Sequence, residues 1–178
     1  MQINDYMKGR RALRSIKRFG MEFTIRDQNL CDHGYNVATL FYLLCKEMGV
    51  SLTASDMFIA LQHDFVESMT GDLNKMIKDL SPETADAWDV IEQSIVPYGL
   101  QYLTRKRIAY DWNEYSQKTY ILQISDALEA LIYCYEERAM GNSALSGAIG
   151  HYSGLLYTMT KDVMILNSII EEIKGGFQ

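Results

Sequence analysis

The sequence contains few residues that interrupt helices or cross-link a chain. Its 178 residues include only two prolines, Pro82 and Pro97, and only three cysteines. Apolar residues recur at three- and four-residue spacing through most of the chain, which predicts an all-helical fold. Cys31, Cys45 and Cys134 are odd in number, widely spaced and form no C-x-x-C pattern. We therefore expect free thiols in a reducing compartment and no disulfide framework.

The sequence also lacks a long apolar run and a surplus of positive charge. The longest apolar run, Val37 to Cys45, has nine residues and includes Thr39, so it is too short to span a bilayer. The N-terminus has no signal-peptide apolar region and carries an early acid, Asp5. The net charge of −6 argues against general attraction to nucleic acid. These absences predict a cytoplasmic protein with no membrane association and no stable nucleic-acid partner.

The length and composition fit a single domain spanning residues 1–178. Apolar residues make up 48% and charged residues 22% of the chain, which is ordinary globular composition. Helices are predicted over residues 4–17, 32–48, 58–70, 84–95, 114–140 and 143–173, with a shorter amphipathic piece at 74–80. The segment 19–30 is predicted to be an irregular connection. Glycines at 147, 150 and 154 predict that the last helix packs closely inside the domain or against a second copy, as in a homodimer or larger homo-oligomer.

One stretch concentrates residues that bind metals and move protons. If residues 58–70 form one helix, Glu67 lies four residues after His63 and three after Asp64, so the three side chains lean toward one patch. Gly71 is a plausible helix stop and would place Asp72 beside the same patch. Such a patch could hold a cation and leave an acid to accept a proton. A histidine next to an aspartate is weak evidence alone, because such histidines are more often hydrogen-bonded than metal-bound.

Two further residues extend this set. His33 opens the second predicted helix, and Asp126 lies in the middle of the most apolar helix of the chain. A carboxylate there is costly to bury unpaired, and either a cation or a buried arginine would relieve the cost. Two imidazoles and two carboxylates form a mixed nitrogen and oxygen site that suits Mn, Fe, Co, Ni or Zn. His151 has no partner pattern and is predicted to be structural or exposed.

The order of these residues resembles a known signature. His33, His63-Asp64 and Asp126 are similar to the H…HD…D pattern of the HD-domain metal-dependent phosphohydrolases. Further stretches resemble the 5'-deoxynucleotidase branch of that superfamily and its compact phage relatives, which hydrolyse deoxynucleoside triphosphates such as dATP. These stretches are Lys17-Arg18-Phe19, Asp32-His33, His63-Asp64-x-x-Glu67-x-x-x-Gly71-Asp72-Leu73, Ser125-Asp126-Ala127-Leu128-Glu129-Ala130 and the segment from Glu136 to Asn142. They lie between residues 14 and 142.

The resemblance implies an all-α HD-domain helical bundle with one divalent transition metal ion, either Co, Mn, Zn, Fe or Ni. It assigns His33, His63, Asp64 and Asp126 as metal ligands, Glu67 and Asp72 as catalytic acids, and Arg18, Phe19 and Asp72 as substrate-binding residues. Glu67 would activate the attacking water, and Arg18 would contact phosphate. Phe19, where the family usually has tryptophan, would flank the sugar and help to exclude a 2'-hydroxyl. Met21 is a candidate for the base pocket, and Lys75 and Lys78 could neutralise a longer phosphate tail or simply be surface residues.

Two functions are consistent with this pattern. The first is metal-dependent hydrolysis of the 5' phosphoester of a 2'-deoxynucleotide. A monophosphate would give deoxynucleoside and phosphate, and a triphosphate such as dATP would give deoxynucleoside and triphosphate. The second is a catalytically inactive HD-fold module that binds a nucleotide for regulation. If the protein is viral, the host cytoplasm is the expected compartment.

Overall fold

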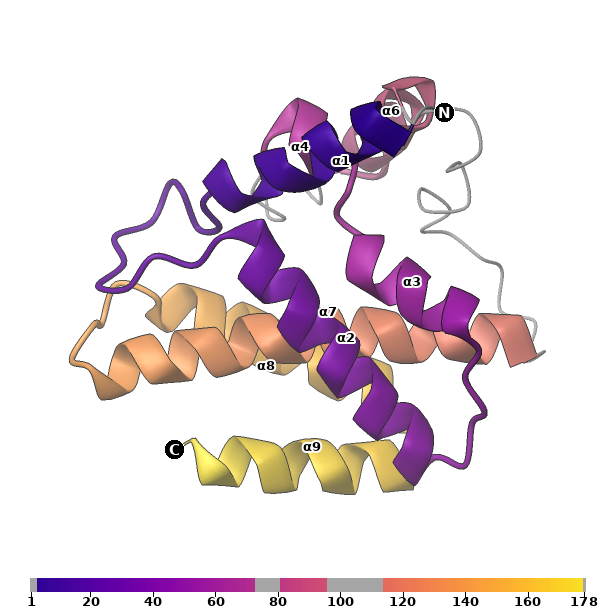
Figure 1. Cartoon of the computed structure of the whole chain (residues 1–178). Coiled ribbons are helices and arrows are strands. Elements are labelled where there is room, and N and C mark those ends of the chain that lie inside the picture. Colours follow the sequence, from indigo (N-terminus) through magenta and orange to yellow (C-terminus); the bar gives the residue numbers. More distant parts are fainter. Residues whose placement is uncertain (1–2, 73–80, 96–113, 178) are drawn as a thin grey trace.

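The all-α prediction is confirmed. A computed structural model describes residues 3–72, 81–95 and 114–177, and the regular structure in these ranges is helical. The elements are α1 (Ile3–Ala12), η1 (Leu13–Ser15), α2 (Leu30–Glu47), α3 (Ala54–Gln62), α4 (Glu67–Thr70), α6 (Pro82–Ile95), α7 (Glu114–Ala139), α8 (Ser146–Thr160) and α9 (Met164–Gly176). Figure 1 shows α1, α4 and α6 gathered at one end of the molecule, with α9 at the opposite side. The predicted amphipathic piece at 74–80 lies outside the described residues.

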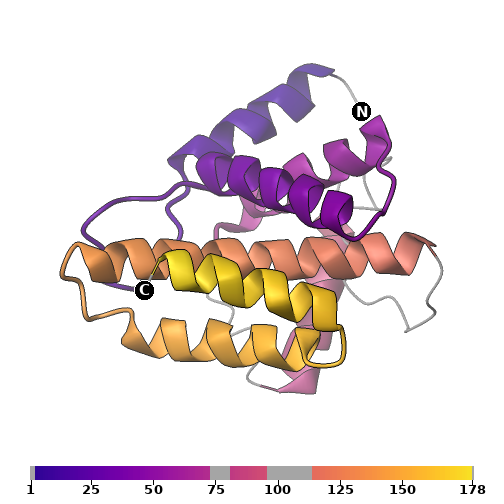
Figure 2. The same ribbon diagram turned by 90° about the horizontal axis from the view of Figure 1, so that it is seen from below.

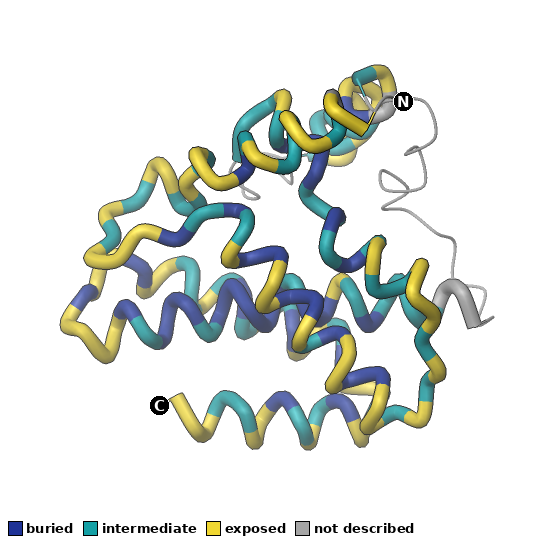
Figure 3. The backbone as a smooth tube through the Cα atoms, in the orientation of Figure 1, coloured by how far each residue is buried: buried dark blue, intermediate teal, exposed yellow. Residues whose placement is uncertain are grey.

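Helix α7 is the centre of the fold. It packs against α2 on one side and α8 on another, and Figure 2 shows α7, α8 and α9 lying side by side. Its middle section is buried almost all round, as the dark-blue tube in Figure 3 shows. Ile124, Leu128 and Leu131 have no exposed surface and join Phe41 and Leu44 of α2 in the main core. A helix that is apolar around most of its circumference is stable only inside a bundle.

The prediction of one helix over residues 143–173 is wrong. The chain leaves the helical conformation at Val163, where φ is −119° and ψ is 83°, and this divides the segment into α8 and α9. The break lets α9 fold back so that Leu166 and Ile170, each 1% exposed, reach the main core. Burying two large aliphatic side chains stabilises this arrangement by several kcal/mol relative to an extended helix in water, at roughly 1.5–3 kcal/mol each.

The glycines of α8 do not bring helices together inside the domain, so that part of the prediction is also wrong. A Cβ atom at Gly147, Gly150 or Gly154 would meet no atom of the described residues within 4 Å. All three positions face outward. The alternative expectation, packing against a second copy, stays a prediction.

The prediction of one helix over residues 58–70 is wrong as well. A capping box between Thr53 and Asp56 starts α3, which ends at Gln62. The backbone then tightens to i→i−3 hydrogen bonds, with Phe65 N donating to Gln62 O at 2.9 Å and Glu67 N donating to Asp64 O at 3.0 Å. This turn buries the adjacent side chains of Phe65 and Val66 in a small cluster. The partly buried residues of that cluster are Tyr6, Ile59 and Ile95.

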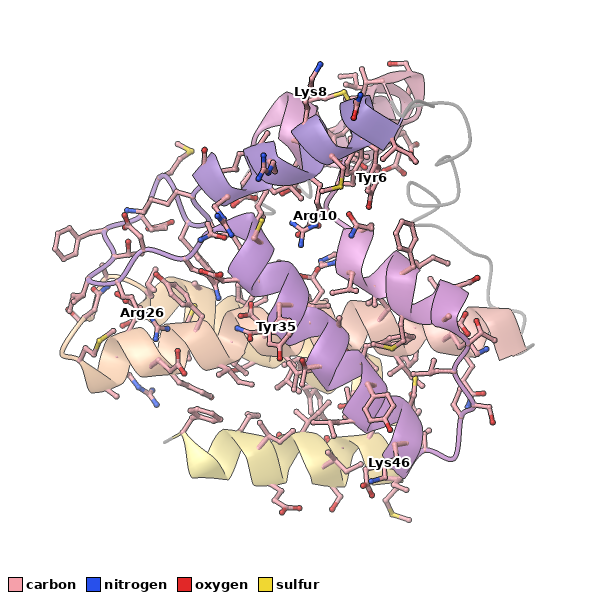
Figure 4. All side chains as sticks on the ribbon, viewed as in Figure 1. Tyr6, Lys8, Arg10, Arg26, Tyr35 and Lys46 are labelled. Atoms are coloured by element: carbon pink, nitrogen blue, oxygen red, sulfur yellow. The ribbon has the colours of Figure 1, made fainter. Side chains whose placement is uncertain are left out.

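Helix α1 is connected to the start of α2 through a side chain. Arg10 extends from α1 toward α2 (Figure 4), and its Nη1 lies 2.8 Å from Cys31 Sγ. Cys31, Cys45 and Cys134 are all free thiols, as predicted. No helix within the described ranges is both long and apolar enough to cross a bilayer.

The segment between η1 and α2 is irregular, as predicted, but it is held at both ends. At its base, Arg18 N donates to Gln28 O at 2.8 Å and Leu30 N donates to Ile16 O at 3.1 Å. At its tip, the Glu137 carboxylate of α7 accepts hydrogen bonds from Ile25 N at 2.7 Å and Arg26 N at 2.8 Å. We call residues 17–29 the anchored loop. Since it carries Arg18 and Phe19, the anchoring fixes where those side chains lie.

We expect Glu137→Ala to lower the free energy of unfolding by about 1–3 kcal/mol, because two partly buried backbone N–H groups and the Asn142 amide lose their acceptor. Urea unfolding followed by circular dichroism measures this. The matched control is Glu136→Ala, whose side chain is 38% exposed and pairs with Arg26. The control should change stability by no more than about 0.5 kcal/mol. Equal losses in the two variants would contradict the anchoring role.

Candidate metal centre

Two imidazoles and a carboxylate meet between α2 and the turn after α3. His33 is fully buried in the first turn of α2, His63 follows the end of α3, and Asp64 is the next residue. The two Nε2 atoms are 3.3 Å apart. Asp64 Oδ2 lies 3.3 Å from His33 Nε2 and 3.2 Å from His63 Nε2. We call these three residues the ligand trio.

The spacing and chemistry of the ligand trio fit a metal ion. Transition-metal bonds to imidazole nitrogen or carboxylate oxygen are about 2.1 Å long, which places neighbouring donors ~3.0–3.4 Å apart in octahedral or tetrahedral geometry. The three observed separations lie within that range. Mixed nitrogen and oxygen donors suit a divalent transition metal. The trio can therefore hold such an ion with positions left for other ligands.

Both imidazoles are oriented through their other nitrogen. His63 Nδ1 lies 2.8 Å from the carbonyl oxygen of Ala60, and His33 Nδ1 lies 2.5 Å from Glu129 Oε2. A carbonyl and a carboxylate only accept hydrogen bonds, so we assign the ring proton to Nδ1 in both residues. With Nδ1 protonated, Nε2 is the nitrogen that faces the trio in each residue and the one that a metal ion would use in place of a second proton.

Asp126 approaches the trio from α7. Its Oδ1 lies 3.1 Å from His33 Nε2 and 3.9 Å from Arg18 Nη1. The sequence left open whether a cation or an arginine would neutralise this carboxylate. In the structure the same oxygen lies next to both the trio and a guanidinium, so the two possibilities do not exclude each other.

Arg18 is almost fully buried behind the trio, with 11% of its side chain exposed. Its Nη1 contacts His33 Nδ1 and lies 3.6 Å from Glu129 Oε2. Burial opposes its charge, but Asp126, Glu129 and Asp64 hold the pKa of the guanidinium above its usual value. Arg18 therefore stays cationic beside the candidate metal position.

The carboxylates stabilise positive charge at the centre of the site. Burial and Arg18 lower the pKa of His33, but hydrogen bonds that its ring donates to Asp126, Asp64 and Glu129 outweigh them and raise it well above its usual value. Burial also lowers the pKa of His63, and Asp64 outweighs that effect and raises it. Burial opposes ionisation of Asp64, yet the two histidines hold its pKa well below its usual value. The surroundings thus favour a cation where the two Nε2 atoms meet.

Phe19 is held in an uncommon backbone conformation. Its φ of 54° is in the left-handed region, which non-glycine residues rarely adopt. Its ring stacks on Tyr133 with centroids 5.2 Å apart and meets Tyr152 edge-on at 6.4 Å. Two ring contacts and the anchored loop compensate for the strained backbone, and they leave the half-buried ring next to Arg18.

Of the other predicted site residues, Glu67, Asp72 and Met21 are not members of the trio. Glu67 is buried at the start of α4, and Asp72 is half-buried just after Gly71, whose φ is 74°. Met21 is 78% exposed on the anchored loop. Lys75 and Lys78 lie outside the described residues. His151 is half-buried on α8, with its ring centroid 5.2 Å from that of Tyr152.

Several residues that contact the site were assigned no role from the sequence. These are Gln28, Asn36, Glu129, Tyr133, Glu137 and Tyr152. A signal was present for Glu129, which lies one helical turn after Asp126 on the same apolar helix. The argument that Asp126 is costly to bury unpaired applies equally to Glu129. The aromatic partners of Phe19 had no comparable signal, since tyrosines at core positions are common.

The chain is similar to known deoxynucleotidases along most of its length. The family described as "5'-deoxynucleotidase YfbR-like" matches residues 5–165. A 5'-deoxynucleotidase of Photorhabdus laumondii is 28% identical over 149 residues, which is 77% of this chain and 75% of the relative. The 5'-deoxynucleotidase YfbR of Escherichia coli is 28% identical over 144 residues, which is 74% of this chain and 71% of the relative.

Two solved structures with the same fold are HD-domain phosphohydrolases. One is the cyanophage S-2L HD phosphohydrolase DatZ, bound to dA and one catalytic Zn²⁺ ion. It superposes with a TM-score of 0.71 at 20% identity, and the match covers 99% of this chain and 96% of the DatZ chain. An HD-domain phosphohydrolase of Listeria innocua superposes with a TM-score of 0.77 at 20% identity, over 99% of this chain and 90% of its own. These structural similarities show an HD-domain fold, and the family match shows that the chain lies in the 5'-deoxynucleotidase branch. The chain belongs to the YfbR-like 5'-deoxynucleotidase family.

Proposed function

We propose that this chain hydrolyses the 5' phosphoester of 2'-deoxynucleotides with one divalent transition metal ion, either Mn, Co, Zn, Fe or Ni. The observation that carries the proposal is the ligand trio, in which two Nε2 atoms and a carboxylate oxygen are spaced as metal ligands are. Asp126 is the fourth proposed ligand. Family membership supports the same activity, because the relatives are named 5'-deoxynucleotidases.

The residues around the trio have separate tasks in this reaction. A bound metal ion supplies charge neutralisation for the phosphate and makes a water molecule more acidic. Arg18 offers a cationic donor to a phosphate oxygen, and its burial strengthens that interaction because water screens it little. Glu67 accepts the proton of the attacking water, and Asp72 helps to hold the substrate. Phe19 packs against the deoxyribose where a 2'-hydroxyl would otherwise sit.

The remaining expectations belong to the same proposal. The whole chain acts as one domain, which is supported by the packing of Leu166 and Ile170 of α9 in the same core as α2 and α7. The substrate is a free nucleotide and not a nucleic acid, which the net charge of −6 supports. A homo-oligomer is expected from the outward-facing glycines of α8. Met21, Lys75 and Lys78 remain candidates for contacts with the base and with a phosphate tail.

A substrate panel tests the activity. Deoxy- and ribonucleotides at each level of phosphorylation are incubated with protein loaded with Mn, Co or Zn, and phosphate and triphosphate are measured separately. We expect deoxynucleotides to be hydrolysed in preference to ribonucleotides. Phosphate from monophosphates identifies a 5'-nucleotidase, and triphosphate identifies a triphosphohydrolase. Metal-loaded protein that turns over none of them would instead be the inactive nucleotide-binding module.

Two substitutions separate metal binding from chemistry. Asp64→Ala removes a ligand of the trio, so we expect metal affinity to fall at least about 100-fold and turnover to be lost with it. Glu67→Gln keeps the shape of the buried side chain but removes the base, so metal affinity should stay within about threefold of wild type while kcat falls by about 10²–10⁴. Metal titration by calorimetry and steady-state kinetics measure both. The assigned roles are wrong if Glu67→Gln loses metal as strongly as Asp64→Ala.

Phe19 is expected to select the sugar. Phe19→Ala opens space beside the ribose, so the ratio of kcat/KM for deoxy- over ribonucleotide should fall by about tenfold or more. Competition assays with matched nucleotide pairs measure the ratio. Phe23→Ala is the control, since Phe23 lies on the same anchored loop and is 72% exposed. An unchanged ratio in Phe19→Ala, or an equal loss in the control, would contradict this role.

A further inference from the structure

A buried carboxylate that is not a proposed ligand lies behind the ligand trio. Glu129 is on α7, one turn after Asp126, and only 4% of its side chain is exposed. We propose that Glu129 is a positioning residue that keeps the ring proton of His33 on Nδ1, so that Nε2 is the atom offered to the metal ion. This inference rests on the metal site of the proposed function, and it concerns how the chain prepares that site.

The two oxygens of Glu129 have different partners. Oε2 lies 2.5 Å from His33 Nδ1 and 3.6 Å from Arg18 Nη1. Oε1 accepts hydrogen bonds from Gln28 Nε2 at 2.6 Å and Asn36 Nδ2 at 3.1 Å. The Gln28 and Asn36 amide nitrogens fix the rotation of the carboxylate, which therefore presents Oε2 to His33. An oxygen held in this way can only accept, so it selects the ring form with the proton on Nδ1.

Arg18 makes this selection necessary. Its Nη1 contacts the same His33 Nδ1 atom. A guanidinium only donates hydrogen bonds, so if it were the sole partner of Nδ1, that nitrogen would have to accept and the proton would move to Nε2. A protonated Nε2 cannot bind a metal ion. Glu129 keeps the proton on Nδ1, because its Oε2 atom pairs with the guanidinium and also accepts a hydrogen bond from Nδ1–H.

The ring orientations of the two histidines of the trio therefore depend on different kinds of hydrogen-bond acceptor. His63 Nδ1 lies against a backbone carbonyl, that of Ala60, which no side-chain substitution removes. His33 depends on a side chain from another helix, 96 residues away in sequence. Only the His33 orientation can be tested by substitution, and Glu129 is the residue to change.

The test compares variants by metal binding and not by turnover. Glu129→Leu replaces the carboxylate with an apolar side chain of similar size, and Glu129→Leu combined with Arg18→Met removes the buried pair together. We expect the affinity of Glu129→Leu for Zn²⁺ and Mn²⁺, titrated by calorimetry, to fall by about 10–100-fold. Because the variant leaves Arg18 with one counter-charge fewer, its thermal unfolding midpoint should fall, so the titrations are run at a temperature at which circular dichroism shows each variant to be folded. Glu136→Leu, on the same helix with a 38% exposed side chain, is the matched control and should bind both ions as wild type does.

A second substitution distinguishes positioning from a structural role. In Glu129→Leu, Arg18 is left to donate to His33 Nδ1, so removing that donor with Arg18→Met should recover about tenfold of the lost affinity. Long-range proton–nitrogen NMR spectra of the zinc-loaded protein report the ring form directly, and the wild type should carry the His33 proton on Nδ1. Wild-type affinity in Glu129→Leu, no recovery in the double variant, or a wild-type proton on Nε2 would each overturn the inference.

The outcomes also separate this inference from the proposed activity. If metal binds and the variants behave as described but no nucleotide is hydrolysed, only the activity is wrong. If the nucleotides are hydrolysed and Glu129→Leu binds metal normally, only the inference is wrong. A wild-type protein that binds none of Zn²⁺, Mn²⁺, Co²⁺, Fe²⁺ and Ni²⁺ would refute both.

Discussion

The structure depends on neutralising several charges that are buried where α2 crosses α7. The side chains of His33, Glu129 and Arg18 are 0%, 4% and 11% exposed, and they lie beside the apolar core that joins the two helices. Any one of these groups, buried and ionised alone, would cost several kcal/mol. Together each has a counter-charge or a hydrogen-bond partner within 4 Å. Packing of the two helices therefore brings the site residues together, and removing one partner would leave another charge buried without it.

Three departures from regular backbone geometry carry candidate site residues. The turn after α3 holds His63 and Asp64, the positive φ of Phe19 lies beside Arg18, and the positive φ of Gly71 precedes Asp72. Strained or irregular backbone persists only where surrounding contacts compensate for it. Here the compensation is visible in the buried Phe65 and Val66 after the turn and in the ring of Tyr133 under Phe19. The regular helices form the core, and the exceptions direct the polar side chains toward one place.

The sequence was informative wherever a local signal and the final packing agreed. Asn29 caps α2 through hydrogen bonds from Cys31 N and Asp32 N, and Ser81 Oγ accepts from Thr84 N at the start of α6, so those helices were predictable within a few residues. No glycine or proline marks the helix breaks after Gln62 and Thr160. The free energy gained by burying apolar side chains sets where these helices end. The side chains are Phe65 and Val66 at the first break, and Leu166 and Ile170 at the second. The order of His33, His63, Asp64 and Asp126 pointed to a shared centre. The roles of the residues behind that centre depend on which oxygen faces which donor, and spacing along a chain contains no such information.

The charge balance of the centre explains why a cation matters for binding as well as for chemistry. Among the described residues, Asp64, Asp126 and Glu129 lie near the guanidinium of Arg18, and these four groups together carry two negative charges in excess when both imidazoles are neutral. Asp126, Asp64 and Glu129 raise the pKa of His33, and Asp64 raises that of His63, because protons on the rings reduce this excess when no metal ion does. A divalent ion would cancel the same excess and displace those protons. Without a metal ion, the excess negative charge of the centre would repel an anionic phosphate. The carboxylates that favour a metal ion therefore also make phosphate binding depend on that ion.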